Sequence, residues 1–288
     1  MEKFADIHVH STLKPINSYL SNPDRKNGSL WFQKSPTKRQ RNNNITKYTQ
    51  SDFKTLIQGN VKIAFVSLYP IEQGWFASKS TNFIVDFLAH IATGFPIKRI
   101  NQIQSPKYNY FNELQKEYNF LINEISTPHE IQCNGETKLF SAKIPQYVEE
   151  IESFLKEENT LIVIPTIEGG NNLISGNANN IKNFDLNQTL RNIRVIKDLD
   201  FPPFFITIAH HFFNGMTGHA KSLFGKNKFQ NLIKNVLLNQ LEGISSKINA
   251  IGWKVIKSLL SVDEFKYNGI RILIDTKHLN AISRIEYY

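Results

Sequence analysis

The sequence predicts an α/β fold of the (β/α)8 TIM-barrel type, with about five of the eight β/α units in this chain. Apolar segments typical of buried strands alternate with amphipathic helical segments, which favours a parallel sheet with right-handed crossovers. Every strand but the second is followed by candidate ligand or catalytic residues, and barrel active sites lie at these carboxyl ends. An open doubly wound sheet would carry phosphate-binding glycines after an early strand, and Gly169-Gly170 lacks that spacing.

The first predicted strand ends in two histidines, His8 and His10. Side chains alternate along a strand, so residues two apart point the same way and can share one ion. Neutral imidazole is a common ligand of zinc, and this pair would supply half a site. The alternative is a pair of surface histidines near the start of the chain.

The next part of the sequence predicts a loop, a short helix and a second strand. Residues 11–48 form a long polar loop, which is unusual inside a compact domain and often functional. Ser51 is the expected N-cap of a short helix that ends at Gly59. The apolar segment 61–68 is typical of a strand buried on both faces. Residues 73–143 are expected to be a mainly helical insertion, and residues 144–155 carry the apolar stripe of a further helix.

The three remaining strands are predicted at residues 160–167, 204–209 and 269–274, with helices at 190–199 and within 228–260. They are followed in turn by Glu168, by His210 and His211, and by the segment 275–278, which contains Asp275 and His278. We therefore expect a single hydrolase domain over residues 1–288.

Composition places the chain among globular proteins. Its 288 residues are 41% hydrophobic and include 21 Phe, enough for a substantial core. The single cysteine, Cys133, excludes an internal disulfide and a thiolate-rich zinc site. The sequence shows no signal-peptide pattern and no apolar run near the length of a membrane span. We expect a cytoplasmic protein.

The net charge of +9 raises the question of nucleic-acid binding. Between Lys14 and Lys54 there are nine basic residues against two Asp, so most of the excess lies in one segment. Its densest part is residues 38–44. Such a segment is more often a solvated loop than a phosphate-binding surface, and we do not expect nucleic acid as a partner.

The strand-end residues predict a metal centre. His8, His10, Glu168 and His278 would form a nitrogen and oxygen ligand set that suits zinc or another divalent ion. A central carboxylate can bridge two ions, which can hold a hydroxide and polarise a carbonyl. His210 or His211 could hydrogen-bond the developing oxyanion, and His219, in a Gly-rich loop, could contact substrate.

These residues also have plainer interpretations. Glu168 could simply occupy a turn before two glycines, and only one of His210 and His211 can face the centre if they continue the strand. His278 could be a surface residue. The sequence alone leaves these alternatives open.

Four segments resemble the membrane (renal) dipeptidase family of the metal-dependent amidohydrolase superfamily. They are Asp6-Ile7-His8-Val9-His10, Thr166-Ile167-Glu168-Gly169-Gly170, Ile206-Thr207-Ile208-Ala209-His210 and Leu273-Ile274-Asp275-Thr276-Lys277-His278. The resemblance implies zinc ligands at His8, His10, Glu168 and His278, with Glu168 bridging two ions. It also implies that His210 contacts the scissile carbonyl of a dipeptide or related small amide.

Two departures limit this resemblance. The family has His-x-Asp in its first segment, where this chain has His8 and His10. The family's sixth-strand His and eighth-strand Asp have no counterpart. Either the barrel is truncated at its C-terminus, which is the interpretation we favour, or the missing strands come from another polypeptide, or the chain does not form a closed barrel. The exposed sheet edges of an incomplete barrel favour aggregation or the binding of a partner protein, and a homodimer is possible.

Two other functions remain as alternatives. A phosphoesterase of the His-x-His type would usually carry another His within a few tens of residues, but none occurs between His10 and His90. A non-catalytic, degenerate barrel could instead bind a protein or nucleic acid through its basic loop.

Overall fold

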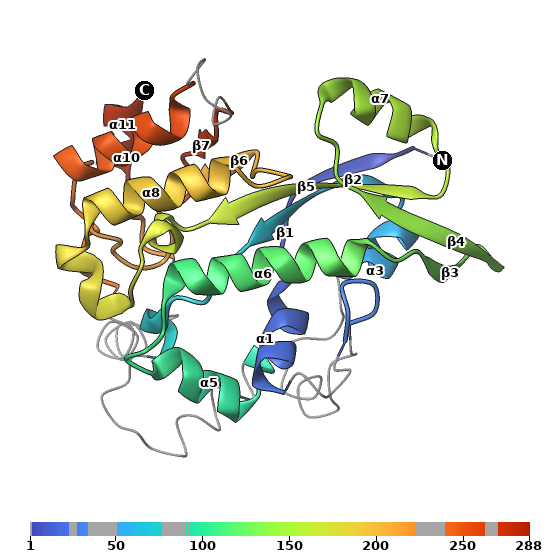
Figure 1. The fold of residues 1–288 in the computed structure, drawn as a ribbon, viewed down its shortest axis with the longest axis horizontal. Coiled ribbons are helices and arrows are strands. Elements are labelled where there is room, and N and C mark those ends of the chain that lie inside the picture. Colours follow the sequence, from blue (N-terminus) through green and yellow to red (C-terminus); the bar gives the residue numbers. More distant parts are fainter. Residues whose placement is uncertain are drawn as a thin grey trace. The chain divides into compact units, whose positions relative to one another are not determined.

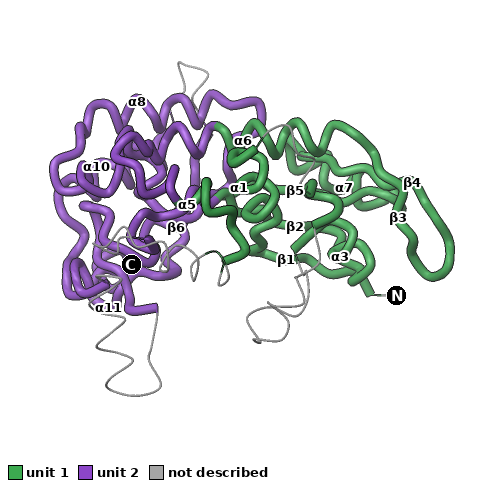
Figure 2. Tube along the Cα trace, turned by 90° about the horizontal axis from the view of Figure 1, so that it is seen from below, with its two compact units in different colours: residues 1–68, 86–100, 116–166 green, residues 69–85, 101–115, 167–288 purple. Residues whose placement is uncertain are grey.

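A computed structural model of the chain describes residues 2–22, 28–33, 51–76, 90, 93–222, 240–262 and 270–288. Contacts divide the chain into two compact units, shown in Figure 2. Unit 1 comprises residues 1–68, 86–100 and 116–166, and unit 2 comprises residues 69–85, 101–115 and 167–288. The division falls within one strand, so each unit is described by itself.

The described elements alternate between strands and helices along most of the chain (Figure 1). The strands are β1 (Phe4–Val9), β2 (Val61–Leu68), β3 (His129–Cys133), β4 (Glu136–Lys143), β5 (Thr160–Glu168), β6 (Phe205–Thr207) and β7 (Leu273–Asp275). The α-helices are α1 (Leu13–Ser21), α3 (Phe53–Gln58), α5 (Ile97–Gln104), α6 (Tyr110–Ile125), α7 (Val148–Lys156), α8 (Leu186–Lys197), α10 (Ala250–Leu260) and α11 (Ala281–Tyr287). Short 3-10 helices are η1 (Gln73–Phe76), η2 (Gly170–Leu173) and η3 (Ala178–Asn183).

In unit 1 the strands follow the order β1-β2-β5-β4-β3. β1 is parallel to β2, and β4 is parallel to β5 and antiparallel to β3. Alternate residues of β2, among them Ala64 and Val66, are fully buried, and so are nearly all residues of β5. The burial of β5 matches its continuous apolar character, whereas the first residues of β2 alternate between buried and partly exposed, so β2 is not buried on both faces along its whole length as predicted.

In unit 2 the end of β5 pairs with β6, and β6 pairs with β7, both in parallel. Helix α10 contacts both β7 and α8. The core contains Ile206 from β6, Ile193 from α8 and Leu259 from α10, none of which is exposed to solvent.

Taken together, the pairings form a mixed α/β fold with a mostly parallel sheet. Among the described residues no pairing joins β7 to β1. Closing a barrel of this type takes eight tilted parallel strands, and the described residues supply the five predicted parallel strands as β1, β2, β5, β6 and β7. A closed barrel is therefore not shown.

Three local expectations were wrong. The predicted loop 11–48 begins with helix α1, and the N-cap of α3 is Asp52, whose carboxylate accepts from the Thr55 N–H at 2.9 Å. The insertion 73–143 is helical only as far as Ile125 among its described residues, because β3 and β4 form a hairpin at its end. Asn134-Gly135, both with positive φ, supply the two-residue turn that such a hairpin needs.

Helix α7 begins four residues later than predicted, at Val148. Pro145 disfavours helical geometry at the residue before it, and the carboxylate of Glu150 accepts from the N–H groups of Gln146 and Tyr147 ahead of the first turn. The start of the helix is therefore fixed by capping rather than by its apolar stripe.

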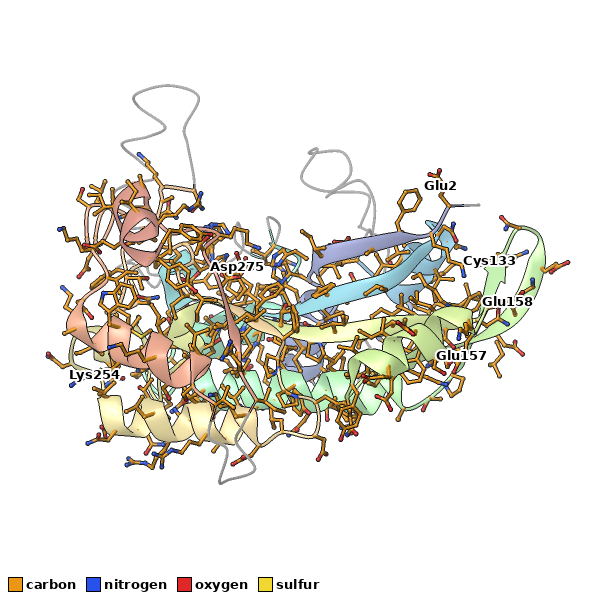
Figure 3. All side chains as sticks on the ribbon, turned by 90° about the horizontal axis from the view of Figure 1, so that it is seen from above. Glu2, Cys133, Glu157, Glu158, Lys254 and Asp275 are labelled. Atoms are coloured by element: carbon orange, nitrogen blue, oxygen red, sulfur yellow. The ribbon has the colours of Figure 1, made fainter. Side chains whose placement is uncertain are left out.

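Other predictions fall partly outside the described residues. The basic stretch 38–44 and the first part of the helical segment 228–260, up to residue 239, lie there, as do residues 263–269 ahead of β7. Cys133, at the end of β3, is a free, half-buried thiol (Figure 3). Among the described helices, none is long and apolar enough to span a bilayer.

The turn after β5 depends on two glycines. Gly169 has a φ of +101°, in the left-handed region that favours glycine. Gly170 has no such φ, but a Cβ there would lie 2.6 Å from the carbonyl oxygen of Ile208. Because Gly169 and Gly170 also donate hydrogen bonds to Thr207 and Ile208, the turn lies directly against the chain that follows β6.

We predict that Gly170→Ala lowers the free energy of unfolding by about 1–3 kcal/mol, the usual cost of adding a methyl group to a packed site. Urea unfolding measures the change. Gly59→Ala is the control, because the nearest atom to its Cβ would be a backbone oxygen at 3.3 Å. Equal stability of the two variants would contradict the close approach at Gly170.

Candidate active site

Three strand ends lie in one row in unit 2. Glu168 of β5 is the partner of Thr207 of β6, and Thr207 is the partner of Asp275 of β7. The Thr207 hydroxyl donates to the Asp275 carboxylate at 2.7 Å, and the Lys277 N–H donates to the same carboxylate at 2.9 Å. These bonds fix the turn that carries His278, whose φ of +67° is uncommon for a residue other than glycine.

Four side chains gather at this row: Glu72, Glu168, His210 and His278, called the rim cluster below. Glu168 and His210 are only 3% exposed, and His278 is 23% exposed. His210 Nε2 lies 3.4 Å from Glu168 Oε2, and His278 Nε2 lies 3.5 Å from Glu168 Oε1. Candidate ligand atoms of Glu168, His210 and His278 all lie within 4.8 Å of one another.

These separations fit an ion better than direct hydrogen bonds. An N–H···O bond has its heavy atoms about 2.9 Å apart. Two ligand atoms each about 2.1 Å from a tetrahedral zinc ion lie about 3.4 Å from one another. The donor set of one carboxylate and two imidazoles is also one that zinc accepts, so the residues fit a divalent metal.

Lys277 supplies positive charge to the same carboxylate. Its ammonium nitrogen lies 3.3 Å from Glu168 Oε1 and 3.8 Å from Asp275 Oδ2. A buried carboxylate without a partner is costly, so this lysine helps to balance Glu168. Its side chain is 37% exposed, which places the ammonium at the solvent side of the cluster.

Glu72 is the member of the rim cluster that the sequence did not indicate. The distance between Glu72 Oε2 and His210 Nδ1 is 2.6 Å, and both side chains are 3% exposed. Glu72 also accepts from the Tyr69 hydroxyl at 3.1 Å and from the Phe212 N–H at 3.2 Å. Burial by itself would raise the pKa of Glu72, but the charge and hydrogen bond of His210, the charge of His211 and the Tyr69 hydrogen bond outweigh it and lower the pKa below its usual value.

The expectation that β2 alone lacks a polar group at its end is therefore corrected. β2 ends at Leu68, and the carboxylate comes four residues later, after Tyr69-Pro70-Ile71. A search of the residues immediately after each strand does not reach it. The feature of the sequence that could have indicated Glu72 is its position as an acidic residue directly before the Gln73–Phe76 turn.

His211 lies beside the rim cluster. Its ring centroid is 3.8 Å from that of His210 and 5.2 Å from that of His278, because β6 ends at Thr207 and strand alternation no longer separates residues 210 and 211. Its Nδ1 hydrogen-bonds the Ser222 hydroxyl at 2.5 Å, and Trp75 packs edge-on at 4.8 Å. Burial, with the charges of His210 and His278, lowers the pKa of His211 to about 3.

Asn214 holds the loop that presents these histidines. Its side-chain amide donates to the Ile208 carbonyl at 2.6 Å, and its oxygen accepts from the N–H groups of Met216 and Thr217 at 3.0 Å. Asn214 is 2% exposed, so this clamp is protected from water. The orientation of the residues after β6 is therefore set by buried hydrogen bonds.

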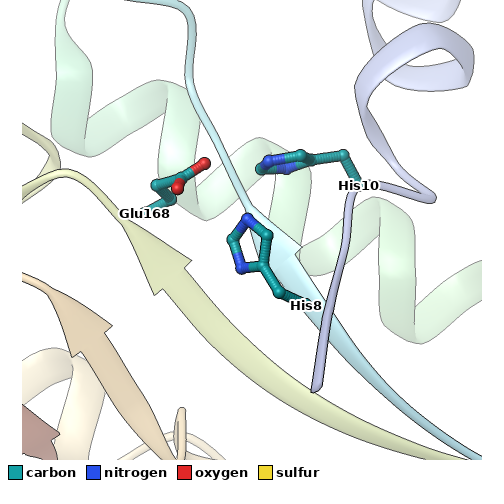
Figure 4. Close-up of side chains that lie close together, drawn as sticks. All are labelled: His8, His10 and Glu168. Carbon is teal, nitrogen blue, oxygen red and sulfur yellow. The ribbon is translucent and has the colours of Figure 1, made fainter. Parts of the chain in front are cut away.

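His8 and His10 lie in unit 1, where the sequence placed them, and extend from the same side of β1 (Figure 4). Their ring centroids are 4.8 Å apart. His10 Nδ1 lies 3.1 Å from the Ser67 carbonyl oxygen, which can only accept. The proton of a neutral His10 therefore sits on Nδ1 and its lone pair on Nε2, the form that can bind a metal.

His219 is placed differently from the other predicted site residues. Its Nδ1 lies 3.1 Å from the Ala220 carbonyl oxygen and its Nε2 lies 2.8 Å from that of Glu242. The residue is 1% exposed, and it forms an isolated bridge with Leu279. The structure thus directs its ring to backbone carbonyls and does not bring it into the rim cluster.

Comparison with known proteins gives little. No family model matches the sequence, and no curated protein matches it. One solved structure with a similar fold is the probable dipeptidase PvdM from Pseudomonas aeruginosa, with a TM-score of 0.47 and 10% identity. The similarity covers 97% of this chain and 47% of that chain, so this chain spans about half of its length. A likeness of this size does not establish a family.

The lowered pKa of His211 predicts that the folded chain becomes less stable at acidic pH. An unfolded chain binds a proton at this histidine below about pH 6.5, whereas the folded chain does so only near pH 3. The contribution to stability is therefore fully present above about pH 6.5 and is lost as the pH falls toward 3. We expect unfolding free energy to fall less steeply between pH 6.5 and 4 in His211→Gln than in the parent.

Chemical denaturation in a chelating buffer measures this slope without a contribution from metal loss. His129→Gln, which removes a histidine that packs against Trp31 in unit 1, is the control for the loss of an imidazole elsewhere in the chain. An unchanged slope in His211→Gln would show that His211 titrates alike in both states.

Proposed function

We propose that the chain is a metal-dependent, dipeptidase-like hydrolase that cleaves a dipeptide or a related small amide. The observation that carries the proposal is the buried carboxylate of Glu168 with two imidazoles at 3.4 and 3.5 Å. The 3.5 Å spacing between His278 and Glu168 fits two ligands of a shared divalent ion, and His210 lies close enough to Glu168 to act on a substrate bound beside that ion. The ordered segments that resemble the membrane dipeptidase family supply the reaction class.

In this proposal His8, His10, Glu168 and His278 would hold zinc. The metal would polarise the carbonyl group of the substrate and activate a water molecule. The proposal requires the residues at the carboxyl ends of β1 and β5, two strands separated by β2 in the strand order, to bind the same metal centre. Metal stoichiometry tests this requirement directly. The sixth-strand His and eighth-strand Asp of the family are not part of the proposal, because this sequence has no residues to assign to them.

The chain's own side chains have three tasks. His210 Nε2 faces Glu168, and in the doubly protonated form of the ring, with Nδ1–H held by Glu72, Nε2–H would donate a hydrogen bond to the carbonyl oxygen of the amide as charge develops on it. The Thr207–Asp275 bond would hold the β7 turn so that His278 keeps its position. Burial excludes water from Glu168 and His210, which strengthens each electrostatic contact made there.

His211 is assigned a supporting role beside the substrate. Because burial lowers its pKa to about 3, it is neutral near pH 7 and adds no charge to the cluster. Its ring contacts those of His210 and Trp75. His219 is left out of the proposed substrate contacts, since its ring nitrogens lie against backbone carbonyls.

We predict that Glu168→Gln reduces bound zinc and lowers kcat/KM for dipeptide hydrolysis by at least about 100-fold. Loss of a residue that only orients a ligand costs roughly 10- to 100-fold, and loss of a ligand costs at least as much. Elemental analysis of the purified chain and an assay with a set of dipeptides measure both quantities.

Asp52→Asn is the matched control, because it also removes a buried carboxylate charge. Asp52 is 2% exposed and caps α3 in unit 1, and asparagine can keep that cap. We expect it to retain zinc and activity. A parent chain that binds no zinc, or a Glu168→Gln variant as active as the parent, would refute the proposal.

A further inference from the structure

His210 lies between two buried carboxylates. Glu72 Oε2 is 2.6 Å from its Nδ1, and Glu168 Oε2 is 3.4 Å from its Nε2. The two ring nitrogens therefore have different partners at different distances. The shorter contact is a close hydrogen bond, whereas the longer one is beyond the usual N–H···O distance.

Glu72 is held independently of His210. The Phe212 N–H donates to its Oε1 at 3.2 Å, and the Tyr69 hydroxyl donates to its Oε2 at 3.1 Å. The Tyr69 oxygen in turn accepts from Trp75 Nε1 at 2.8 Å, which leaves the hydroxyl proton for Glu72. Fixed donors thus set the position of the carboxylate before His210 is considered.

This arrangement assigns the proton of a neutral His210. Phe212 N–H and the Tyr69 hydroxyl already donate to Glu72, so Glu72 acts as an acceptor. His210 must then donate from Nδ1, and its lone pair is on Nε2, the nitrogen that faces Glu168. The orientation of the His210 ring is also restricted by an edge-on contact with the Tyr69 ring, whose centroid is 4.6 Å away.

We propose that Glu72 is the positioning residue of the site, which sets the tautomer and the orientation of His210. This inference rests on the proposed function for its effect on hydrolysis. The tautomer itself follows from the hydrogen bonds of unit 2 alone. Glu72 acts through His210 and need not touch substrate.

The variant Glu72→Gln tests the tautomer sharply, because an amide has only one oxygen. The Phe212 N–H is a backbone donor and cannot turn away, so the amide oxygen is expected to face it. The amide NH2 then takes the place of Oε2 and points at His210 Nδ1, while the Tyr69 hydroxyl can rotate to accept. His210 would have to change to the Nε2–H tautomer.

Nitrogen-15 NMR of the purified full chain, labelled at its histidines and measured near pH 8, reports the tautomer of each ring. His210→Asn identifies the His210 signals by their absence. We expect Nδ1–H in the parent and in Asp52→Asn, and Nε2–H in Glu72→Gln. We also expect kcat of Glu72→Gln to fall about 10- to 100-fold with a smaller change in KM.

The outcomes separate the two proposals. An Nε2–H parent, or a Glu72→Gln variant that keeps Nδ1–H, would overturn the role of Glu72. The parent spectrum decides this even if the variant does not fold. A parent that shows Nδ1–H but hydrolyses no dipeptide would leave the positioning of His210 standing and refute the proposed function.

Discussion

The buried carboxylate of Glu168 is the constraint on which the candidate site depends. A charge with 3% of its side chain exposed needs compensation, and three groups from later parts of the chain supply it. His210 comes from the loop after β6, and Lys277 and His278 come from the turn after β7. Both loops are therefore tied to the end of β5.

These loops can approach Glu168 closely because the two residues after it are glycines, which have no side chain. Gly169 and Gly170 allow the turn after β5 to pass against the residues after β6, where a Cβ at Gly170 would contact the Ile208 carbonyl. Asn214 then ties the following loop back to that same carbonyl. The Glu-Gly-Gly segment thus has a packing role in addition to carrying the carboxylate.

Several parts of the site could be predicted from the sequence because strands impose a simple rule. Apolar runs identified β2 and β5, and the polar segments that follow the predicted strands contained Glu168, His210 and His278. Glu72 could not be found in this way, because Tyr69-Pro70-Ile71 separates it from β2 and its contact with His210 joins residues 138 positions apart in sequence. His219 shows the opposite case, because a Gly-rich loop resembled a substrate loop and its ring instead lies against backbone carbonyls.

The sequence by itself determined the order of the five predicted parallel strands and the residues that follow most of them, because burial periodicity is a local property. It also contained the Asn134-Gly135 hairpin turn, which the apolar pattern obscured. Only the tertiary structure decided which histidine nitrogen faces which carboxylate, that residues 210 and 211 both approach His278, and that Glu72 joins them. Such choices depend on hydrogen bonds and burial between residues far apart in the chain, which no local pattern records.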